Sequence, residues 1–133
     1  MKTTTTLLGD YEYEAENPNG HKVDIDMRPA GEKVGQSPTE LLLSALSGCA
    51  SVDLVSMLKK RKRTVNGLKV EAEGTRKDEH PRAFIYIKLH FTLNSPDAKQ
   101  EEFEKLGHLA ATKYCSVAGT LNAEVEHVFT IER

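Results

Sequence analysis

The feature that most constrains how this chain folds is an almost unbroken apolar segment from Leu41 to Leu58. Its leucine, valine, alanine and methionine side chains would point in every direction around a helix axis, so a helix here needs cover on most of its sides. The helical pattern extends from Ser37 to about Arg63, a length of roughly 39 Å, whereas a domain of this size has a radius of gyration of about 14 Å. A single sheet cannot cover such a helix. We therefore expect a homodimer in which two chains share the burial of this segment.

The start of this helix carries a capping-box pattern. Ser37 is the expected N-cap, Pro38 takes the first helical position, and Glu40 reaches back to the cap. A membrane span is the alternative for the whole apolar segment, but Asp53, four serines and a glycine interrupt it, which favours the buried helix of a soluble protein. The chain also opens without an apolar stretch of signal-peptide length, so we expect a cytoplasmic protein that does not associate with a membrane.

The other segments predict two groups of strands and a second helix. Alternating apolar and polar residues indicate strands, and Gly, Pro and Asn clusters indicate the turns between them. The expected order is β-β-β-α-β-β-α-β, a single α+β domain over residues 1–133 with antiparallel sheets. The expected strands cover residues 3–8, 11–16, 21–27, 64–77, 82–94 and 123–132, and the second helix starts with a serine-proline pair at Ser95 and runs to Cys115.

Composition excludes several classes of partner. Apolar residues make up 38% and charged residues 29% of the chain, an ordinary globular balance, and the formal charge is −2. The one basic cluster, "KKRKR" at Lys59–Arg63, suits the solvated C-terminus of the long helix. No aromatic residue is interleaved with it, so we expect no nucleic-acid partner. The five histidines and two cysteines lack the spacing of a zinc site, so we expect no metal.

The two cysteines are Cys49, inside the apolar helix, and Cys115, where the second helix ends. A chain of this length needs no disulfide to fold, and in the cytoplasm a cysteine pair is more often catalytic or redox-active than structural. Two interpretations of Cys49 stay open: a small buried hydrophobe or a nucleophile. Because it lies far beyond the first turn, its own helix cannot lower its pKa. A cation would have to do so, and Arg28, Arg76 and Arg82 are the candidates.

The sequences around these two cysteines resemble those of a known protein family. The segment "SPTELLLSALSGCASVDLVSML", followed about 65 residues later by "KYCSV", resembles the OsmC/Ohr family of cysteine-based organic hydroperoxide reductases. The resemblance extends over nearly the whole chain through "GHKVDIDM" and "PRAFIYIKLHF". It implies an intertwined homodimer, with antiparallel sheets wrapped around long central helices and active sites at the subunit interface. It also implies that Cys49 is the peroxidatic thiol and Cys115 the resolving thiol, with no metal or organic cofactor.

The residues that support the thiol in this family differ here. An arginine from the N-terminal strands and a glutamate near the start of the central helix usually organise it. Arg28 and Glu40 are the matching candidates in this chain, but Arg28 lies just before the helix, and Thr39 occupies the position that usually holds the glutamate. Glu40 also has the simpler role of completing the helix cap. These differences resemble the OsmC-like branch, in which the fold is kept and peroxidase activity is often unproven.

The resemblance therefore implies a function in oxidative stress defence. In this reading Cys49 reduces an alkyl or lipid hydroperoxide to the alcohol, its sulfenic acid condenses with Cys115 to a disulfide, and a small or protein dithiol restores both thiols. The alternative is a non-catalytic dimer of the same fold that binds an apolar or thiol-reactive small ligand at the interface. Retention of both cysteines favours the enzyme, whereas Thr39 in place of the glutamate favours the alternative.

Overall fold

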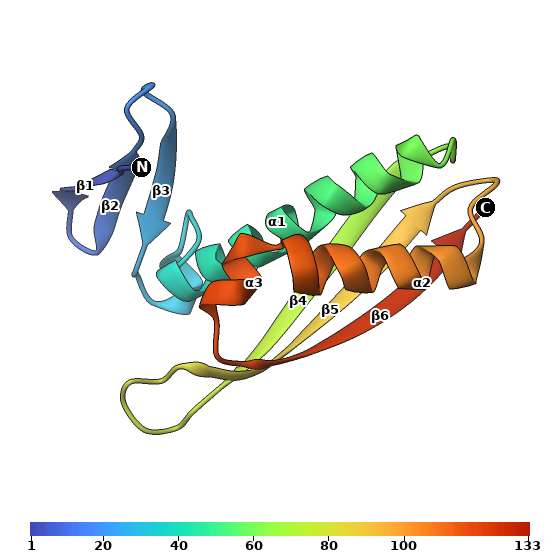
Figure 1. Ribbon diagram of the computed structural model, residues 1–133. Coiled ribbons are helices and arrows are strands. Elements are labelled where there is room, and N and C mark those ends of the chain that lie inside the picture. The colour runs from blue at the N-terminus through green and yellow to red at the C-terminus, as the bar shows by residue number, and fades with distance from the viewer. The chain divides into compact units, whose positions relative to one another are not determined.

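The computed structural model describes all residues, 1–133, and the chain divides into two compact units, Met1–Leu42 and Leu43–Arg133 (Figure 1). The order of the main elements confirms the predicted β-β-β-α-β-β-α-β, with one short helix added before the last strand. The strands are β1 (Thr4–Gly9), β2 (Glu12–Glu16), β3 (Lys22–Asp26), β4 (Gly67–Arg76), β5 (Phe84–Asn94) and β6 (Glu124–Glu132); the helices are α1 (Pro38–Lys60), α2 (Gln100–Leu109) and α3 (Ser116–Thr120).

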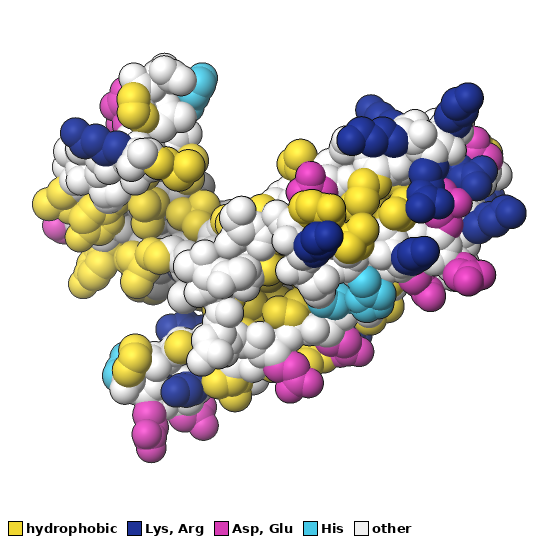
Figure 2. Space-filling view, viewed as in Figure 1, with side chains coloured by type: hydrophobic (Ala, Val, Ile, Leu, Met, Phe, Trp, Pro, Cys, Tyr) yellow, Lys and Arg dark blue, Asp and Glu magenta, His cyan; other side chains and the backbone are white.

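The first unit contains an antiparallel meander in which β2 lies between β1 and β3. Leu7 pairs with Tyr13, and Tyr13 pairs with Ile25, so apolar side chains share one face of the sheet, as the alternation predicts. Leu7 remains 63% exposed and Val23 48% exposed. The chain thus leaves this apolar face largely uncovered, and Figure 2 shows hydrophobic side chains gathered on the surface of this unit.

Helix α1 begins with the predicted capping box. The Ser37 backbone N–H donates to Glu40 Oε1 at 3.1 Å, and the Glu40 N–H donates to Ser37 Oγ at 3.3 Å. The helix ends at Lys60, three residues earlier than predicted. Lys62 adopts a positive φ of 60° and the Arg63 N–H donates back to the Leu58 carbonyl at 3.0 Å, so a left-handed cap closes the helix inside the basic cluster.

In the second unit, helices α1 and α2 lie side by side on one face of the sheet β4-β5-β6 (Figure 1). Strands β4 and β5 are antiparallel, but β5 and β6 are parallel, so the prediction of purely antiparallel sheets is wrong for this sheet. The cause is the connection: α2 and α3 carry the chain from the end of β5 back along the sheet, and a crossover of this kind returns the next strand in the same direction.

Two rows of buried side chains form the core of this unit. The alternation predicted for the strand after residue 82 is confirmed, since every second residue of β5 from Ile87 onward is buried. Helix α1 contributes a stripe at every fourth residue. The core rows are Ile87, Leu89, Phe91 and Leu93 on β5, and Leu46, Ala50, Leu54 and Leu58 on α1.

Helix α2 begins at Gln100, so the prediction that the second helix starts at Ser95 is wrong. The Ser95 hydroxyl is buried and accepts the backbone N–H groups of Asp97 at 3.4 Å and Ala98 at 3.1 Å, which makes a local turn instead of a helix cap. After α2 the chain forms a π-helical turn, Ala110–Tyr114, directly before Cys115. Such turns occur often at functional sites.

Helix α1 is the one helix long and apolar enough to cross a membrane, by length and composition alone. Its most apolar window has a mean hydropathy of 1.8, and only 22% of that window is buried within the chain. One stripe of α1 therefore packs on the sheet of the second unit, while Val52, for example, stays 70% exposed.

Candidate functional site

The second unit brings the two cysteines together. Cys49 comes from the middle of α1 and is half-buried, while Cys115 follows the π-helical turn and is buried. Both thiols are free, and their side chains are joined by a hydrogen bond. The two thiols to which the family resemblance assigns a joint role therefore lie next to each other in the second unit.

The start of α3 supplies backbone N–H groups to both sulfurs. The N–H groups of Ser116 and Val117 donate to the Cys49 sulfur. Cys115 is the N-cap of α3, and its sulfur accepts the Ala118 N–H at 3.4 Å. The first turn of a helix has no intrahelical partners for these N–H groups, so the sulfurs satisfy them. We call the N–H groups of Ser116 and Val117 the amide cradle of Cys49.

The amide cradle lowers the pKa of Cys49. The largest cause is the hydrogen bond from the Val117 N–H, and the hydrogen bond from the Cys115 thiol comes next. Burial acts in the opposite direction, and so does the nearby charge of Asp53, as its position one turn beyond Cys49 predicts. The sequence prediction that only a cation could activate Cys49 was thus incomplete, because backbone N–H groups from another helix do so.

The pKa of Cys115 shifts the other way. Burial of its sulfur is the largest cause of the raised pKa, and the hydrogen bond that its thiol donates to Cys49 adds to it. Desolvation disfavours a thiolate, whereas donation to Cys49 requires the proton to stay on Cys115. The arrangement therefore favours ionisation of Cys49 while Cys115 remains a protonated thiol.

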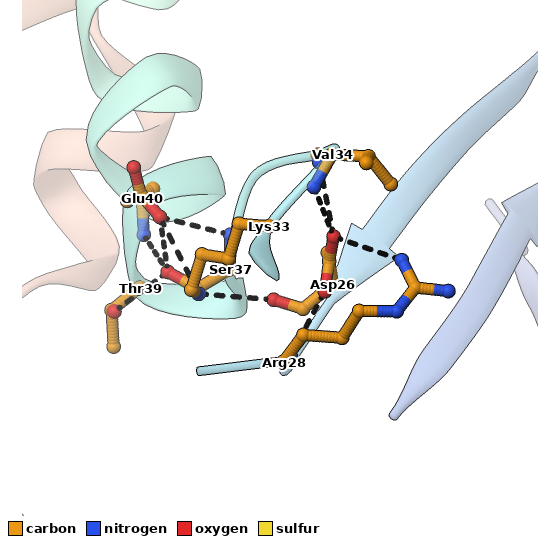
Figure 3. Close-up of polar contacts among 8 residues, drawn as sticks. Asp26, Arg28, Lys33, Val34, Ser37, Thr39 and Glu40 are labelled. Carbon is orange, nitrogen blue, oxygen red and sulfur yellow. Dashed lines mark hydrogen bonds and ion pairs between the residues drawn. The ribbon is translucent and has the colours of Figure 1, made fainter. Parts of the chain in front are cut away.

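Arg28 lies in the first unit, next to the carboxylate of Asp26 (Figure 3). Its guanidinium donates to Asp26 Oδ2 at 3.2 Å and to Glu12 Oε2 at 2.6 Å. Asp26 is only 1% exposed and also accepts the backbone N–H groups of Val34 at 2.7 Å and Gly35 at 3.1 Å. The Val34 N–H is the largest cause of the lowered pKa of Asp26. This network fixes Arg28 and the loop that leads to α1.

Glu40 also belongs to the first unit, where it completes the capping box (Figure 3). Its carboxylate lies 3.9 Å from Lys33 Nζ, and the Ser37 N–H is the largest cause of its lowered pKa. Thr39, at the position where the family usually has a glutamate, places its hydroxyl 3.4 Å from Ser37 Oγ. Arg28 and Glu40 thus take different partners within the first unit and form no pair with each other.

The other two candidate arginines hold the turn between β4 and β5. Arg76 Nε donates to the Arg82 carbonyl at 2.7 Å, and Arg82 Nε donates to the Lys77 carbonyl at 3.1 Å. Neither is among the groups that shift the pKa of Cys49 most. The structure contains no group of three or more His, Cys, Asp or Glu side chains placed to hold a metal ion.

The amide cradle was not predicted from the sequence, because Ser116 and Val117 fall between the predicted second helix and the last predicted strand. The available signal is local: the residues after Cys115 are "SVAGT", short enough for one helical turn, with Cys115 at the capping position. A cysteine at an N-cap indicates that its sulfur accepts a backbone N–H. No local pattern shows that the same turn also reaches Cys49.

Comparisons with known proteins agree with this fold. A family model described as OsmC-like protein matches residues 30–129. The chain is 36% identical over 117 residues to Protein YhfA of Escherichia coli strain K12, which covers 88% of this chain and 86% of that protein.

Solved structures give the same result. The OsmC-like protein from Mycoplasma pneumoniae is similar with a TM-score of 0.86 at 22% identity, covering 99% of this chain and 96% of that one. The organic hydroperoxide resistance protein OhrB of Bacillus subtilis is similar with a TM-score of 0.65 at 17% identity, covering 99% and 98%. These likenesses confirm the α+β fold predicted from the sequence.

Proposed function

This chain belongs to the OsmC-like protein family, and we propose that it is a cysteine-based peroxidase that reduces organic hydroperoxides to alcohols. The observation that carries the proposal is the hydrogen-bonded pair of thiols with opposite pKa shifts. A peroxidase of this type needs one thiol that ionises readily and a second, protonated thiol within reach. Cys49 and Cys115 meet both requirements.

The proposed first step is attack of the Cys49 thiolate on the distal oxygen of the hydroperoxide. The S–O bond forms as the O–O bond breaks, and the alkoxide leaves and takes a proton to become the alcohol. Cys49 is thereby oxidised to a sulfenic acid. The amide cradle of Ser116 and Val117 holds the negative charge on the sulfur before the attack.

In the second step the sulfur of Cys115 attacks the sulfenic sulfur of Cys49. A disulfide forms, and the oxygen leaves as water with the thiol proton of Cys115. A small or protein dithiol then reduces the disulfide by thiol–disulfide exchange, becomes a disulfide itself and returns both protein thiols. We place the protein in the reducing cytoplasm, where such dithiols are available.

The surroundings of Cys49 support an organic substrate over hydrogen peroxide. Cys49 packs against the apolar core cluster of the second unit, which includes Leu46 one turn before it on the same helix. An alkyl or lipid hydroperoxide gains free energy from burying its apolar tail at such a surface, and hydrogen peroxide has no tail to bury.

We propose that the active form is an intertwined homodimer formed from one domain, residues 1–133. Two uncovered apolar surfaces support this: the outer sides of α1, of which little is buried, and the face of the first sheet that carries Leu7 and Val23. A partner chain that covers both apolar surfaces would form a dimer of the kind typical of the family, and it would bury the exposed apolar area. Multi-angle light scattering that finds a monomer at micromolar concentration would contradict this assembly.

Arg28 and Glu40 remain proposed supporting residues. Arg28→Lys keeps the positive charge but loses the paired contacts to Glu12 and Asp26. If Arg28 supports the thiol, this variant should lower peroxidase turnover without unfolding the protein. If Glu40 acts only as the cap, Glu40→Gln should reduce stability and leave turnover per folded molecule unchanged.

The test of the function is a single-turnover titration of the fully reduced protein. Cumene hydroperoxide and hydrogen peroxide are added in parallel, while free thiols and intact mass are followed with time. We expect rapid loss of two thiols per chain, a Cys49–Cys115 disulfide, and faster reaction with the organic peroxide. Thiols that react no faster than free cysteine would overturn the proposal and leave the non-catalytic ligand-binding alternative.

Two variants assign the roles of the thiols. Cys49→Ser should abolish turnover, and continued multiple turnover in this variant would refute the assignment. Cys115→Ser should complete a first turnover and then accumulate sulfinic and sulfonic acid on Cys49, visible as added mass, because no second thiol intercepts the sulfenic acid.

A further inference from the structure

The second unit contains a cavity of about 310 Å³ that is open to solvent at Thr112 and Gly119 and is not lined by either sulfur. It is bordered by α1, the π-helical turn, α3, β5 and β6, and neither Cys49 nor Cys115 lines it. Its walls are apolar apart from two polar side chains, Thr112 and His127. The apolar lining includes Leu46, Leu89, Ala118, Gly119 and Val125.

The volume fits a small organic molecule. Ligand cavities start at about 300 Å³, so this one is at the lower end of that range. One water molecule occupies about 30 Å³ of liquid volume, so the cavity has room for about ten non-hydrogen atoms. Water gains little from apolar walls of this kind, whereas an aliphatic chain would bury apolar surface against them.

The residues of α3 leave this space open because they are small. A Cβ atom added at Gly119 would meet no heavy atom within 4 Å. Ala118, its neighbour, also lines the cavity and donates its backbone N–H to Cys115. The helix therefore has one side toward the thiols and another toward the cavity.

His127 is the lining side chain that can both donate and accept a hydrogen bond with a ligand. The Thr112 hydroxyl already donates to the His108 carbonyl at 2.6 Å, but the His127 ring makes no hydrogen bond within the chain. Its ring is held instead by an edge contact with the His108 ring, with 5.1 Å between centroids, and by Phe91 at 6.4 Å. A held imidazole with free nitrogens can offer one donor and one acceptor.

The charge state of His127 determines which polar group of a ligand the cavity can bind. Burial is the largest cause of its lowered pKa, and the nearby His108 lowers it further. The ring is therefore neutral near neutral pH and offers hydrogen bonds but no positive charge. A carboxylate or phosphate held by His127 would lose part of its hydration against the apolar walls and would find no opposite charge among the lining residues.

We propose that this cavity binds a neutral, mainly aliphatic molecule of about ten non-hydrogen atoms with a single hydroxyl or carbonyl group, which His127 holds by a hydrogen bond. This site lies within one chain and needs no reactive thiol. It is thus independent of the peroxidase proposal, and each can fail without the other.

The test uses 1-octanol as the probe and the full-length Cys49→Ser, Cys115→Ser double variant, which has no thiol chemistry. Two-dimensional NMR spectra follow the backbone signals of Gly119 and the ring signals of His127 during the titration. We expect saturable shifts at both, and octanoate, which has the same chain with a charged end, to bind at least tenfold more weakly. Absence of shifts up to the solubility of octanol, or equal binding of octanoate, would overturn the proposal.

Cavity-filling variants locate the site. Gly119→Leu places a branched side chain into the space and should weaken octanol binding at least tenfold. Thr120→Leu adds the same side chain at the exposed neighbouring position and should leave binding unchanged. Should Gly119→Leu fail to fold, Ala123→Leu enlarges the side chain at another lining position and carries the same expectation. Unchanged binding in a folded cavity-filling variant would overturn the assignment.

A third variant isolates the imidazole. His127→Phe keeps an aromatic ring but removes the hydrogen bond, so octanol affinity should fall about three- to tenfold. Octanol affinity unchanged by this substitution would show that His127 does not hold the hydroxyl and would overturn that part of the proposal.

Discussion

The amide cradle can be tested by removing one N–H group while the helix that carries it stays in place. Ser116 is the first residue of α3, and Cys115 before it has an extended conformation, φ −76° and ψ 101°. Proline is favoured at the first helical position, and the residue before a proline prefers an extended conformation. Ser116→Pro therefore deletes one hydrogen bond to the Cys49 sulfur with little cost to the fold. Ser116→Ala, which keeps the N–H, is the matched control.

The size of the effect follows from the hydrogen bond that is lost. A hydrogen bond to a charged group contributes about 1.5–3 kcal/mol, and the low end applies because Cys49 is half-buried and water can replace part of the contact. About 1.4 kcal/mol lowers the ratio of thiolate to thiol tenfold. The remaining thiolate becomes more basic and about threefold more nucleophilic. Alkylation of Cys49 should thus be about threefold slower where the thiol is mostly protonated, and about threefold faster where it is fully ionised.

The assay is the pH dependence of iodoacetamide alkylation, followed at the Cys49 peptide by mass spectrometry. The rate profiles of Ser116→Pro and wild type should cross, whereas Ser116→Ala should overlay wild type. Circular dichroism and thermal unfolding check that the fold is intact. Overlapping profiles for Ser116→Pro and wild type would refute the conclusion that the Ser116 N–H helps to activate Cys49. A parallel slowing at every pH would show altered access instead of an altered pKa.

Two further predictions concern the frame around the site. Gly107→Ala should destabilise the protein by about 1–3 kcal/mol in urea unfolding, because a Cβ there overlaps the Phe129 ring. Gly31→Ala, which lies outside α1 and where a Cβ meets nothing, should not destabilise it. Asp26 has a lowered folded-state pKa, so its stabilising contribution is present above the ordinary carboxyl pKa of about 3.9 and is lost as the pH falls through the folded-state value. The free energy of unfolding of Asp26→Asn should therefore be lower than that of wild type at neutral pH, and the difference should narrow in acid. A difference that stays constant with pH would contradict a stabilising role for the Asp26 charge and its partner Arg28.

Local patterns in the sequence were sufficient to predict most of the elements. The alternation in β5 predicts which side chains from Ile87 onward are buried, because a strand places successive residues on opposite faces. The capping box at Ser37 predicts the start of α1. A similar serine-proline pair at Ser95 gave a wrong helix start, since the same hydroxyl can accept N–H groups in a turn.

Features that depend on long-range arrangement could not be read in the same way. An alternating strand has the same pattern in parallel and antiparallel sheets, so the sequence of β6 does not reveal that it runs parallel to β5. Likewise, Cys49 contacts the N–H groups of Ser116 and Val117, which are more than sixty positions away in the sequence. Only the fold brings them together, and no residue type marks them, because every residue except proline has a backbone N–H.

The source of Cys49 activation bears on the departure at Thr39. The family resemblance implies a glutamate where this chain has Thr39, which would argue against peroxidase activity if that glutamate were needed to activate the thiol. In this protein the largest contributions that lower the pKa of Cys49 come from the Val117 N–H and the Cys115 thiol, all within the second unit. A side chain at position 39 is not required for those contributions. Thr39→Glu should therefore leave the pH profile of Cys49 alkylation close to that of wild type, whereas Ser116→Pro should change it. A profile that changes in Thr39→Glu and not in Ser116→Pro would show that residues of the first unit activate Cys49.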